Sequence, residues 1–102
     1  MHKLVVLYPQ PPDPEAFRAY YTQTHLPLAA ALPGLGDWRY AFDIGAPGGE
    51  SPYFCIFEAE FVDAAALGAA MASPEGQAVA ADVPNYAPDG AVLISFDVVP
   101  GA

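Results

Sequence analysis

The amino-acid sequence predicts an α+β fold in which four strands and two helical regions follow one another in the order βαββαβ. Two observations predict this order. Four short segments are rich in β-branched and aromatic residues, and the first and last connections between them contain helical segments that begin at good capping residues. With 102 residues, the chain has room for one layer of helix on one layer of sheet. We therefore expect a single domain over residues 1–102.

The first strand is predicted over Lys3 to Pro9, a β-branched run that the prolines of the following segment PQPPDP bring to an end. Asp13 then has the side chain of a helix cap, and Pro14 suits the first helical position. A helix is therefore expected to begin at about Pro14.

The first helix is expected to bury one apolar stripe. A rotation of about 100° per residue brings five side chains together on it: Phe17, Tyr21, Thr24, Leu28 and Leu32. His25 then borders this stripe on one flank and Tyr20 on the other. Pro27 has no amide hydrogen and disfavours helical geometry before it, so we expect the last turns to be kinked or to restart there.

The second and third strands are expected on either side of a Gly-rich hairpin loop. Residues 37–44, DWRYAFDI, alternate strictly between aromatic or apolar residues and mostly polar ones. The third strand, Tyr53 to Phe61, has apolar side chains at most positions of both faces, because Phe54 and Ile56 alternate with other apolar residues. We therefore expect this strand to be covered on both sides.

The second helical region is expected to consist of two pieces. Asp63 caps the alanine-rich residues 64–72, and Ser73 followed by Pro74 opens a continuation that ends before Pro84. The chain then closes with a fourth strand.

The fourth strand, Ala91 to Val99, is again apolar at most positions. The complete order is that of the ferredoxin-like arrangement, in which both helices lie on one face of a four-stranded antiparallel sheet. The other face would stand in water although strands three and four carry apolar side chains on it. We therefore expect a homodimer in which a second copy covers this sheet face.

Charge and cysteine content exclude several classes of partner. The chain has 12 acidic and 3 basic residues, and its formal charge of −9 would repel nucleic acid and anionic lipid surfaces. Its single cysteine, Cys55, cannot form an internal disulfide and is expected in the core. No segment has the length of a signal peptide or a membrane span. A cytoplasmic location without membrane or nucleic-acid partners is therefore expected.

Two stretches of the chain resemble the EthD family, which is named from ethyl tert-butyl ether degradation and lies in the dimeric α+β barrel superfamily. They are FRAYYTQTHLPLAAALPGL and ASPEGQAVAADVPNY, and the resemblance runs from Val5 to about Phe96. It implies a dimer whose sheets pack face to face, with a pocket in each subunit between sheet and helices. It also implies that His25 stands where the family carries its histidine, and that its second motif is present as Asp82, Asn85 and Tyr86.

The resemblance leaves the reaction open. More distant members of the superfamily include polyketide cyclases, dehydratases, lactone isomerases, cofactor-free monooxygenases and haem-degrading enzymes, and fold analogy cannot choose among them. Only the residues of the candidate site can distinguish these reactions.

His25 is the candidate acid/base residue, because an imidazole in an apolar setting can take or give a proton near neutral pH. Its structural alternative is a bond to a main-chain carbonyl freed by Pro27. Asp82 is a candidate to orient the imidazole, and its alternative is a helix-ending residue bonded to nearby amides.

Five aromatic residues are candidates to line a pocket and bind a substrate oxygen, with core or dimer packing as the alternative for each: Tyr20, Tyr21, Trp38, Tyr40 and Tyr86.

Neither a metal nor another cofactor is expected. The two histidines lie far apart, and the sequence lacks recognisable ligand spacings and a Gly-rich phosphate loop before a helix. Haem would require His25 as its axial ligand, with only Lys3, Arg18 and Arg39 to meet the propionates.

The sequence therefore predicts a cofactor-free lyase, isomerase or cyclase that acts on a small hydrophobic, oxygenated molecule. Two alternatives stay open. One is a non-catalytic binding or accessory protein for an oxygenase pathway, and the other is a cofactor-independent monooxygenase.

Overall fold

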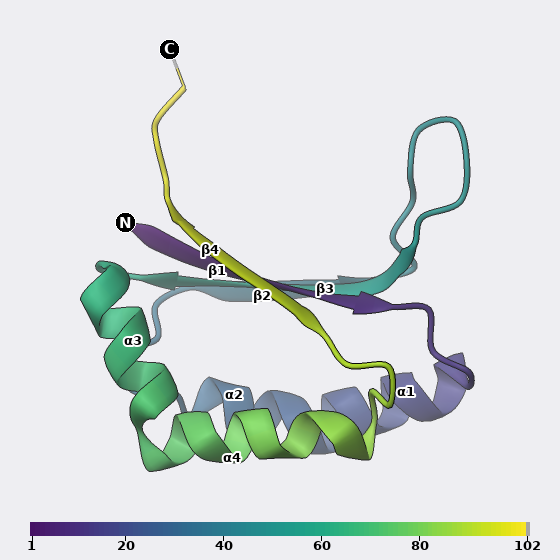
Figure 1. Ribbon diagram of the computed structural model, residues 1–102, viewed down its shortest axis with the longest axis horizontal. Helices are drawn as coiled ribbons and strands as arrows, with labels where there is room; N and C mark the ends of the chain where they lie inside the picture. The colour runs from purple at the N-terminus through teal and green to yellow at the C-terminus, as the bar shows by residue number, and fades with distance from the viewer. Residues whose placement is uncertain (102) are drawn as a thin grey trace.

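Four antiparallel strands form one sheet in the order β2-β3-β1-β4, and the helices cover one of its faces (Figure 1). The computed structural model describes residues 1–101. Its elements are β1 His2–Pro9, α1 Pro14–Tyr20, the π-helical turn η1 Tyr21–His25, α2 Leu26–Ala30, β2 Trp38–Phe42, β3 Tyr53–Phe61, α3 Ala64–Ala72, α4 Pro74–Asp82, the 3-10 turn η2 Val83–Asn85 and β4 Val92–Asp97. The predicted ferredoxin-like βαββαβ order is confirmed.

The helices α1 and α3 begin directly after Asp13 and Asp63, the two capping residues predicted from the sequence. Asp13 accepts a hydrogen bond from the amide of Ala16 at 3.1 Å, and Asp63 accepts one from Ala66 at 2.8 Å. Each carboxylate satisfies an amide that a helix leaves unpaired in its first turn. None of the helices within residues 1–101 is long and apolar enough to cross a bilayer.

The first helix does not follow the predicted stripe to its end. The amide of Leu26 donates to the carbonyl of Tyr21, so the chain makes a π turn with one residue more than an α turn. Pro27 explains the change, because its ring would clash with the carbonyl four residues before it in a straight α-helix. The extra residue rotates the next part of the helix about its axis. Thr24, predicted in the stripe, is exposed, whereas His25 and Leu26 are both buried.

A β-bulge corrects the prediction for Phe54. Tyr8 of β1 pairs with Cys55, and Pro9 pairs with Tyr53, so Phe54 is an extra residue in the third strand. Its ring lies on the helix side, edge-on to Phe17 with centroids 5.4 Å apart, and is buried there. Phe54 therefore adds to the core and not to the open face.

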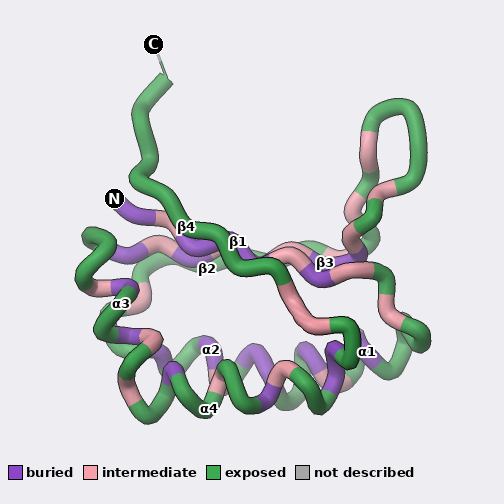
Figure 2. Tube along the Cα trace, viewed as in Figure 1, coloured by how far each residue is buried: buried purple, intermediate pink, exposed green. Residues whose placement is uncertain are grey.

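The core lies between the sheet and the helices (Figure 2). β1 contributes Leu4, Val6 and Tyr8 to it, and β3 contributes Phe57 and Phe61 among others. β4 is exposed along its whole length, as the same view shows. Both edge strands, β2 and β4, are therefore mostly exposed, and one sheet face has no cover from residues 1–101.

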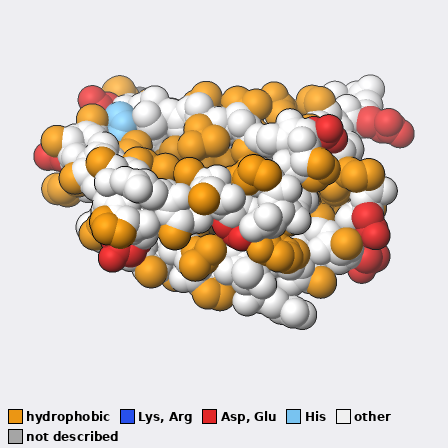
Figure 3. All heavy atoms as spheres, turned by 60° about the horizontal axis from the view of Figure 1, so that its bottom comes forward, with side chains coloured by type: hydrophobic (Ala, Val, Ile, Leu, Met, Phe, Trp, Pro, Cys, Tyr) orange, Lys and Arg blue, Asp and Glu red, His pale blue; other side chains and the backbone are white. Residues whose placement is uncertain are grey.

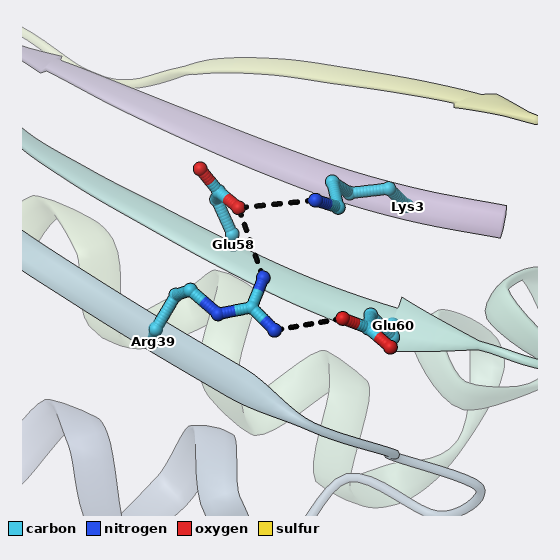
Figure 4. A network of polar contacts seen from close by, with 4 residues as sticks. All are labelled: Lys3, Arg39, Glu58 and Glu60. Atoms are coloured by element: carbon cyan, nitrogen blue, oxygen red, sulfur yellow. Dashed lines mark hydrogen bonds and ion pairs between the residues drawn. The ribbon is translucent and has the colours of Figure 1, made fainter. Parts of the chain in front are cut away.

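The open face combines apolar side chains with a compact charge network. Glu58 of β3 accepts hydrogen bonds from Lys3 at 3.2 Å and from Arg39 at 3.1 Å, and Arg39 also donates to Glu60 at 2.7 Å (Figure 4). The register places this network beside Ile94, which pairs with Val5 and is 47% exposed. The loop between β2 and β3 and the segment after β4 both project on this side of the sheet (Figure 1).

Candidate functional site

A cavity of about 240 Å³ lies between the helix side of the sheet and the helices, with walls from β1, β3, β4 and the helical segments. Nearly all of its lining is aliphatic or aromatic. Among residues 1–101, only three lining side chains carry an oxygen or nitrogen atom, and these are Tyr8, Tyr21 and His25. The polar chemistry of the cavity therefore rests on these three groups.

His25 reaches the cavity because the π turn carries it to the inner side of the helix. Its ring is 3% exposed and stacks on Tyr21, with centroids 5.4 Å apart. It also packs against Tyr86, with ring centroids 4.6 Å apart, and the Tyr21 and Tyr86 rings are themselves 5.6 Å apart. The imidazole is thus one of three rings that all contact one another, and His25 is part of the cavity lining.

Asp82, the last residue of α4, holds the imidazole from behind. Nδ1 of His25 lies 2.9 Å from Oδ2 of Asp82, and both side chains are buried. The other carboxylate oxygen accepts hydrogen bonds from Tyr20 at 2.6 Å and from Asn85 at 3.0 Å. The carboxylate therefore has three donors, which satisfy a charge that burial alone would make costly.

Burial and these hydrogen bonds determine the protonation states of His25 and Asp82. Burial of Asp82 favours its neutral form, but the hydrogen bonds from Tyr20, Asn85 and His25 outweigh it and lower the pKa of the carboxyl. Burial lowers the pKa of His25 below its ordinary value of 6.5, against the opposing effect of Asp82. At neutral pH the site therefore holds a carboxylate and a neutral imidazole.

The carboxylate also selects the tautomer of the imidazole. An ionised Asp82 can only accept hydrogen bonds, so Nδ1 of His25 carries the proton. Nε2 is then a lone-pair acceptor, and it makes no hydrogen bond to any residue in the described part of the chain. Nε2 can therefore accept a proton or a hydrogen bond from a ligand in the cavity.

The tyrosines beside His25 differ in whether their hydroxyls have hydrogen-bond partners. The hydroxyls of Tyr8 and Tyr86 bond to each other at 2.7 Å. The hydroxyl of Tyr21 is buried and has no hydrogen-bond partner among residues 1–101. Burial raises the pKa of Tyr8 to about 12 and raises that of Tyr21 as well, so both hydroxyls keep their protons. Burial also raises the pKa of the nearby Cys55 thiol to about 12, which makes it a poor nucleophile.

The structure brings some of the sequence candidates together and leaves others apart. His25 and Tyr21 line the cavity, and Asp82 and Tyr20 stand behind the imidazole. Tyr86 packs against the rings of His25 and Tyr21 without being part of the lining.

Trp38 and Tyr40 are half-exposed on β2 and are not part of the lining. They contact it from outside, since Tyr40 packs edge-on against Tyr21 at 6.0 Å and Trp38 stacks on Phe57 at 5.9 Å. Tyr8 is a lining residue that the sequence pattern does not single out, although it shares a strand face with Leu4 and Val6. That alternation was the signal that could have found it.

The histidine makes a side-chain contact and not the main-chain bond that was its structural alternative. The turn after Pro27 closes with its own amides, since Ala31 donates to Leu28 and Leu32 donates to Ala29. No group of three His, Cys, Asp or Glu side chains within residues 1–101 is placed to hold a metal ion.

The helix face around the site is apolar and acidic. In the view of Figure 3, hydrophobic side chains cover much of the surface, acidic ones lie among them, and no Lys or Arg side chain is visible. The surroundings of the cavity therefore offer little attraction to an anion.

The sheet order, the covered face and the cavity define a ferredoxin-like α+β protein with a closed-in site beside a buried His–Asp pair. The EthD domain model matches residues 9–90, and the chain belongs to the EthD family. This confirms the family that the two sequence stretches indicated.

Known relatives agree with this assignment. The chain is 32% identical over 97 residues to an uncharacterized 11.0 kDa protein in the thcB-thcC intergenic region of Rhodococcus erythropolis, covering 95% of this chain and 94% of that protein. Among solved structures it is similar to an ethyl tert-butyl ether degradation (EthD) family protein from Bacillus halodurans C-125. The TM-score is 0.90 at 35% identity, and the match covers 97% of this chain and 99% of the other.

A dimeric ferredoxin-like protein of unknown function from Jannaschia sp. CCS1 shares the fold, with a TM-score of 0.67 at 24% identity over 95% of this chain and 97% of that one. A structural neighbour with this fold is thus a dimeric protein.

Proposed function

We propose that this EthD-family chain is a cofactor-free acid/base catalyst of the lyase, isomerase or cyclase type, acting on a small hydrophobic, oxygenated molecule. One observation carries the proposal: His25 donates from Nδ1 to a buried carboxylate while its Nε2 remains unbonded at an apolar cavity. An imidazole in this state is a base of suitable strength near neutral pH.

The pair has the parts that proton transfer needs. When Nε2 takes a proton, the imidazolium stays beside the ionised Asp82, which stabilises the new positive charge at 2.9 Å. Tyr20 and Asn85 keep that carboxylate in place. The same nitrogen can then return the proton to another atom of the substrate, so that His25 serves as both base and acid.

The cavity supports a small, mostly hydrophobic substrate. Its volume of about 240 Å³ equals that of about eight waters in the liquid. Its aliphatic and aromatic lining provides the binding energy by excluding water from apolar surface. A substrate with one or two polar atoms fits this site better than a polar metabolite.

A second candidate function is non-catalytic binding of such a molecule. It is favoured by the fact that His25 is the only lining side chain within residues 1–101 that titrates near neutral pH. A site without a second acid or base can hold a ligand for a partner enzyme without changing it.

The experiment that tests the proposal is a ligand screen followed by a turnover assay. Small neutral carbonyl compounds, alcohols and ethers would be screened by ligand-observed NMR. Binders would then be incubated in D₂O with the protein and followed for isotope exchange or product. Turnover by the native chain that His25→Ala abolishes supports catalysis. Binding without turnover of any binder favours the second candidate.

We also infer that two copies of the chain associate through the open sheet face. Val92, Ile94 and Phe96 are each more than 40% exposed on it, and water would otherwise contact this apolar row. The two segments that project on this side flank the face (Figure 1). The dimeric state of a structural neighbour agrees with this assembly.

A further inference from the structure

The hydroxyl of Tyr21 is the polar group of the cavity whose position the acid/base proposal leaves unexplained. Tyr21 is 0% exposed, and its hydroxyl finds no hydrogen-bond partner among residues 1–101. A buried hydroxyl without a partner destabilises a protein, and native structures rarely keep one. Tyr21 is part of the cavity lining but its hydroxyl is closed off, so an acceptor in the cavity can satisfy it only when the surrounding side chains shift to admit it.

Within residues 1–101, no side chain lies in hydrogen-bond geometry to accept from the Tyr21 hydroxyl. Tyr8 and Tyr86 bond to each other at 2.7 Å, and Asp82 is occupied by three other donors. The Tyr21 ring stacks on His25 with an angle of 23° between the planes. The two rings therefore lie against each other, and both residues are part of the cavity lining.

The charge of the cavity restricts the ligand further. Within residues 1–101, no Lys, Arg, Asp or Glu side chain is part of the lining. An ionised ligand group would therefore be desolvated without an opposite charge to compensate it. Both anionic and cationic ligands are disfavoured, whereas a neutral acceptor oxygen is not.

We propose that the site takes a neutral carbonyl compound, whose oxygen accepts the hydrogen bond of Tyr21 and whose adjacent C–H group faces His25. This inference rests on the proposed function and specifies its substrate class. It makes Tyr21 a catalytic residue, since its hydroxyl touches the substrate oxygen.

The reaction that this pairing supports is enolisation. Nε2 of His25 takes a proton from the carbon next to the carbonyl, so that a C–H bond breaks and an N–H bond forms. The electron pair moves onto the carbonyl oxygen, and the Tyr21 hydroxyl stabilises the resulting enolate. The imidazolium then returns the proton to carbon or to oxygen. The step needs no oxidant, reductant or other reactant.

Three probes of similar size and shape test the ligand class. Acetophenone has the carbonyl and a methyl group that can enolise. Isopropenylbenzene replaces the oxygen with CH₂, and benzoate replaces the methyl group with a negative charge. By calorimetry, acetophenone should bind the native chain about five- to tenfold more tightly than isopropenylbenzene, which is the effect of one hydrogen bond. Benzoate should not bind measurably.

Tyr21→Phe removes the hydroxyl and keeps the ring, and Tyr53→Phe is the matched control at a tyrosine away from the cavity. We expect Tyr21→Phe to abolish the preference for acetophenone over isopropenylbenzene and Tyr53→Phe to preserve it. Tyr21→Phe should also leave the midpoint of chemical denaturation unchanged or raise it, because it removes an unsatisfied group. A lowered midpoint would show that the hydroxyl has a partner within the fold and would overturn the inference.

Isotope exchange separates this inference from the function on which it rests. In D₂O, the native chain should speed deuteration of the acetophenone methyl group. His25→Ala should lose this activity, and Tyr21→Phe should slow it by about a hundredfold or more. Exchange that depends on His25 but not on Tyr21 would overturn the role of Tyr21 and leave the acid/base function standing.

A hydroxyl-dependent preference for acetophenone without any exchange would leave the ligand class standing and overturn the catalytic function. Failure of acetophenone to bind, or equal affinity for the probes with and without the oxygen, would overturn the ligand class.

Discussion

His25 and Asp82 are 57 positions apart in the chain, yet Nδ1 of the imidazole donates to the carboxylate across 2.9 Å inside the protein. The helix that carries His25 and the end of α4 meet under the sheet to make this contact. It fixes the tautomer of the imidazole and leaves Nε2 without a partner among the described residues. The same side chain therefore contributes to stability and is suited to proton transfer.

Replacement of His25 should separate these two roles. His25→Ala removes a donor to Asp82 and two ring contacts, and should lower the free energy of unfolding by about 1–2 kcal/mol. His25→Gln keeps an amide that can donate to Asp82, and should recover most of this loss. Both variants should lose turnover, because neither side chain exchanges protons near neutral pH. Urea denaturation and the exchange assay measure the two effects.

His2→Gln is the control, because it changes the other histidine of the chain, which bonds to Asp97 at the far end of β1. It should keep full turnover. Intact turnover in His25→Gln would show that proton transfer by the imidazole is not part of the function.

Stability and activity should both fall on the acid side of neutrality. Burial holds the pKa of His25 below 6.5 in the folded chain, so the unfolded chain binds a proton first as the pH falls. The contribution of His25 is therefore fully favourable above the unfolded pKa and is lost as the pH falls toward the folded pKa. Asp82 acts in the same sense at lower pH, because its lowered pKa stabilises the fold above 3.8 and this effect is lost below it.

Urea denaturation from about pH 8 to about pH 5 at constant ionic strength measures the first effect. His25→Gln should show a flatter dependence in this range, since its amide does not titrate. The pH–rate profile should rise through a midpoint below 6.5. A midpoint above that value would contradict the neutral, buried state of the imidazole.

Asp82→Asn should disturb the tautomer more than the fold. A carboxylate only accepts hydrogen bonds, whereas an amide also donates, so Nδ1 of His25 would no longer be held as the donor. We expect the ¹⁵N shifts of the imidazole to report a mixture of tautomers, and turnover to fall by about tenfold or more. Asp89→Asn, in an exposed turn, should change neither quantity. Unchanged ¹⁵N shifts in Asp82→Asn would show that the carboxylate does not set the tautomer.

The role of the open sheet face in dimer formation can be tested by introducing one charged side chain. Ile94→Asp places a carboxylate in the middle of the apolar row, where burial against a second copy would leave it without a partner. The native chain should be a dimer at micromolar concentration, with about 1,600 Å² of surface buried, and Ile94→Asp should be a monomer by light scattering. Ala78→Asp makes the same charge change on the exposed side of α4 and should stay dimeric. A monomeric native chain would contradict the assembly.

The regular parts of the fold could be predicted from the sequence because they follow local rules. The alternation in the strands and the caps at Asp13 and Asp63 each depend on a few neighbouring residues, and the structure has them where expected. The second strand is shorter than predicted, since it ends at Phe42. Asp43 then takes a left-handed backbone with φ 56° and binds Arg18, which no alternation pattern reveals.

The irregular parts could not be predicted because each depends on a single extra residue. The π turn before Pro27 moved Thr24 outward and His25 inward, and the bulge turned Phe54 toward the helices. A periodic pattern assumes a constant rotation per residue, so it fails downstream of every such insertion.

In the candidate site, too, some features could be predicted from local rules and others could not. The chemical type of His25 and the family motif pointed to it and to Asp82, but no local rule gives the 2.9 Å contact between segments so far apart in the sequence. Tyr8 was missed because a tyrosine in a strand looks like any other core aromatic residue. The unpaired hydroxyl of Tyr21 is a property of the packed structure, and no pattern of neighbouring residues reveals it.

The charge network on the open face has a consequence for how two such chains approach each other. Each copy carries a formal charge of −9, so two copies repel one another at distances beyond the contact itself. Lys3 and Arg39 offset Glu58 and Glu60 on the sheet, so this face is locally neutral within an acidic protein. It is therefore a surface on which like-charged copies can meet at low electrostatic cost. Added salt screens the remaining repulsion, so it favours this association, whereas it weakens most ion pairs between proteins.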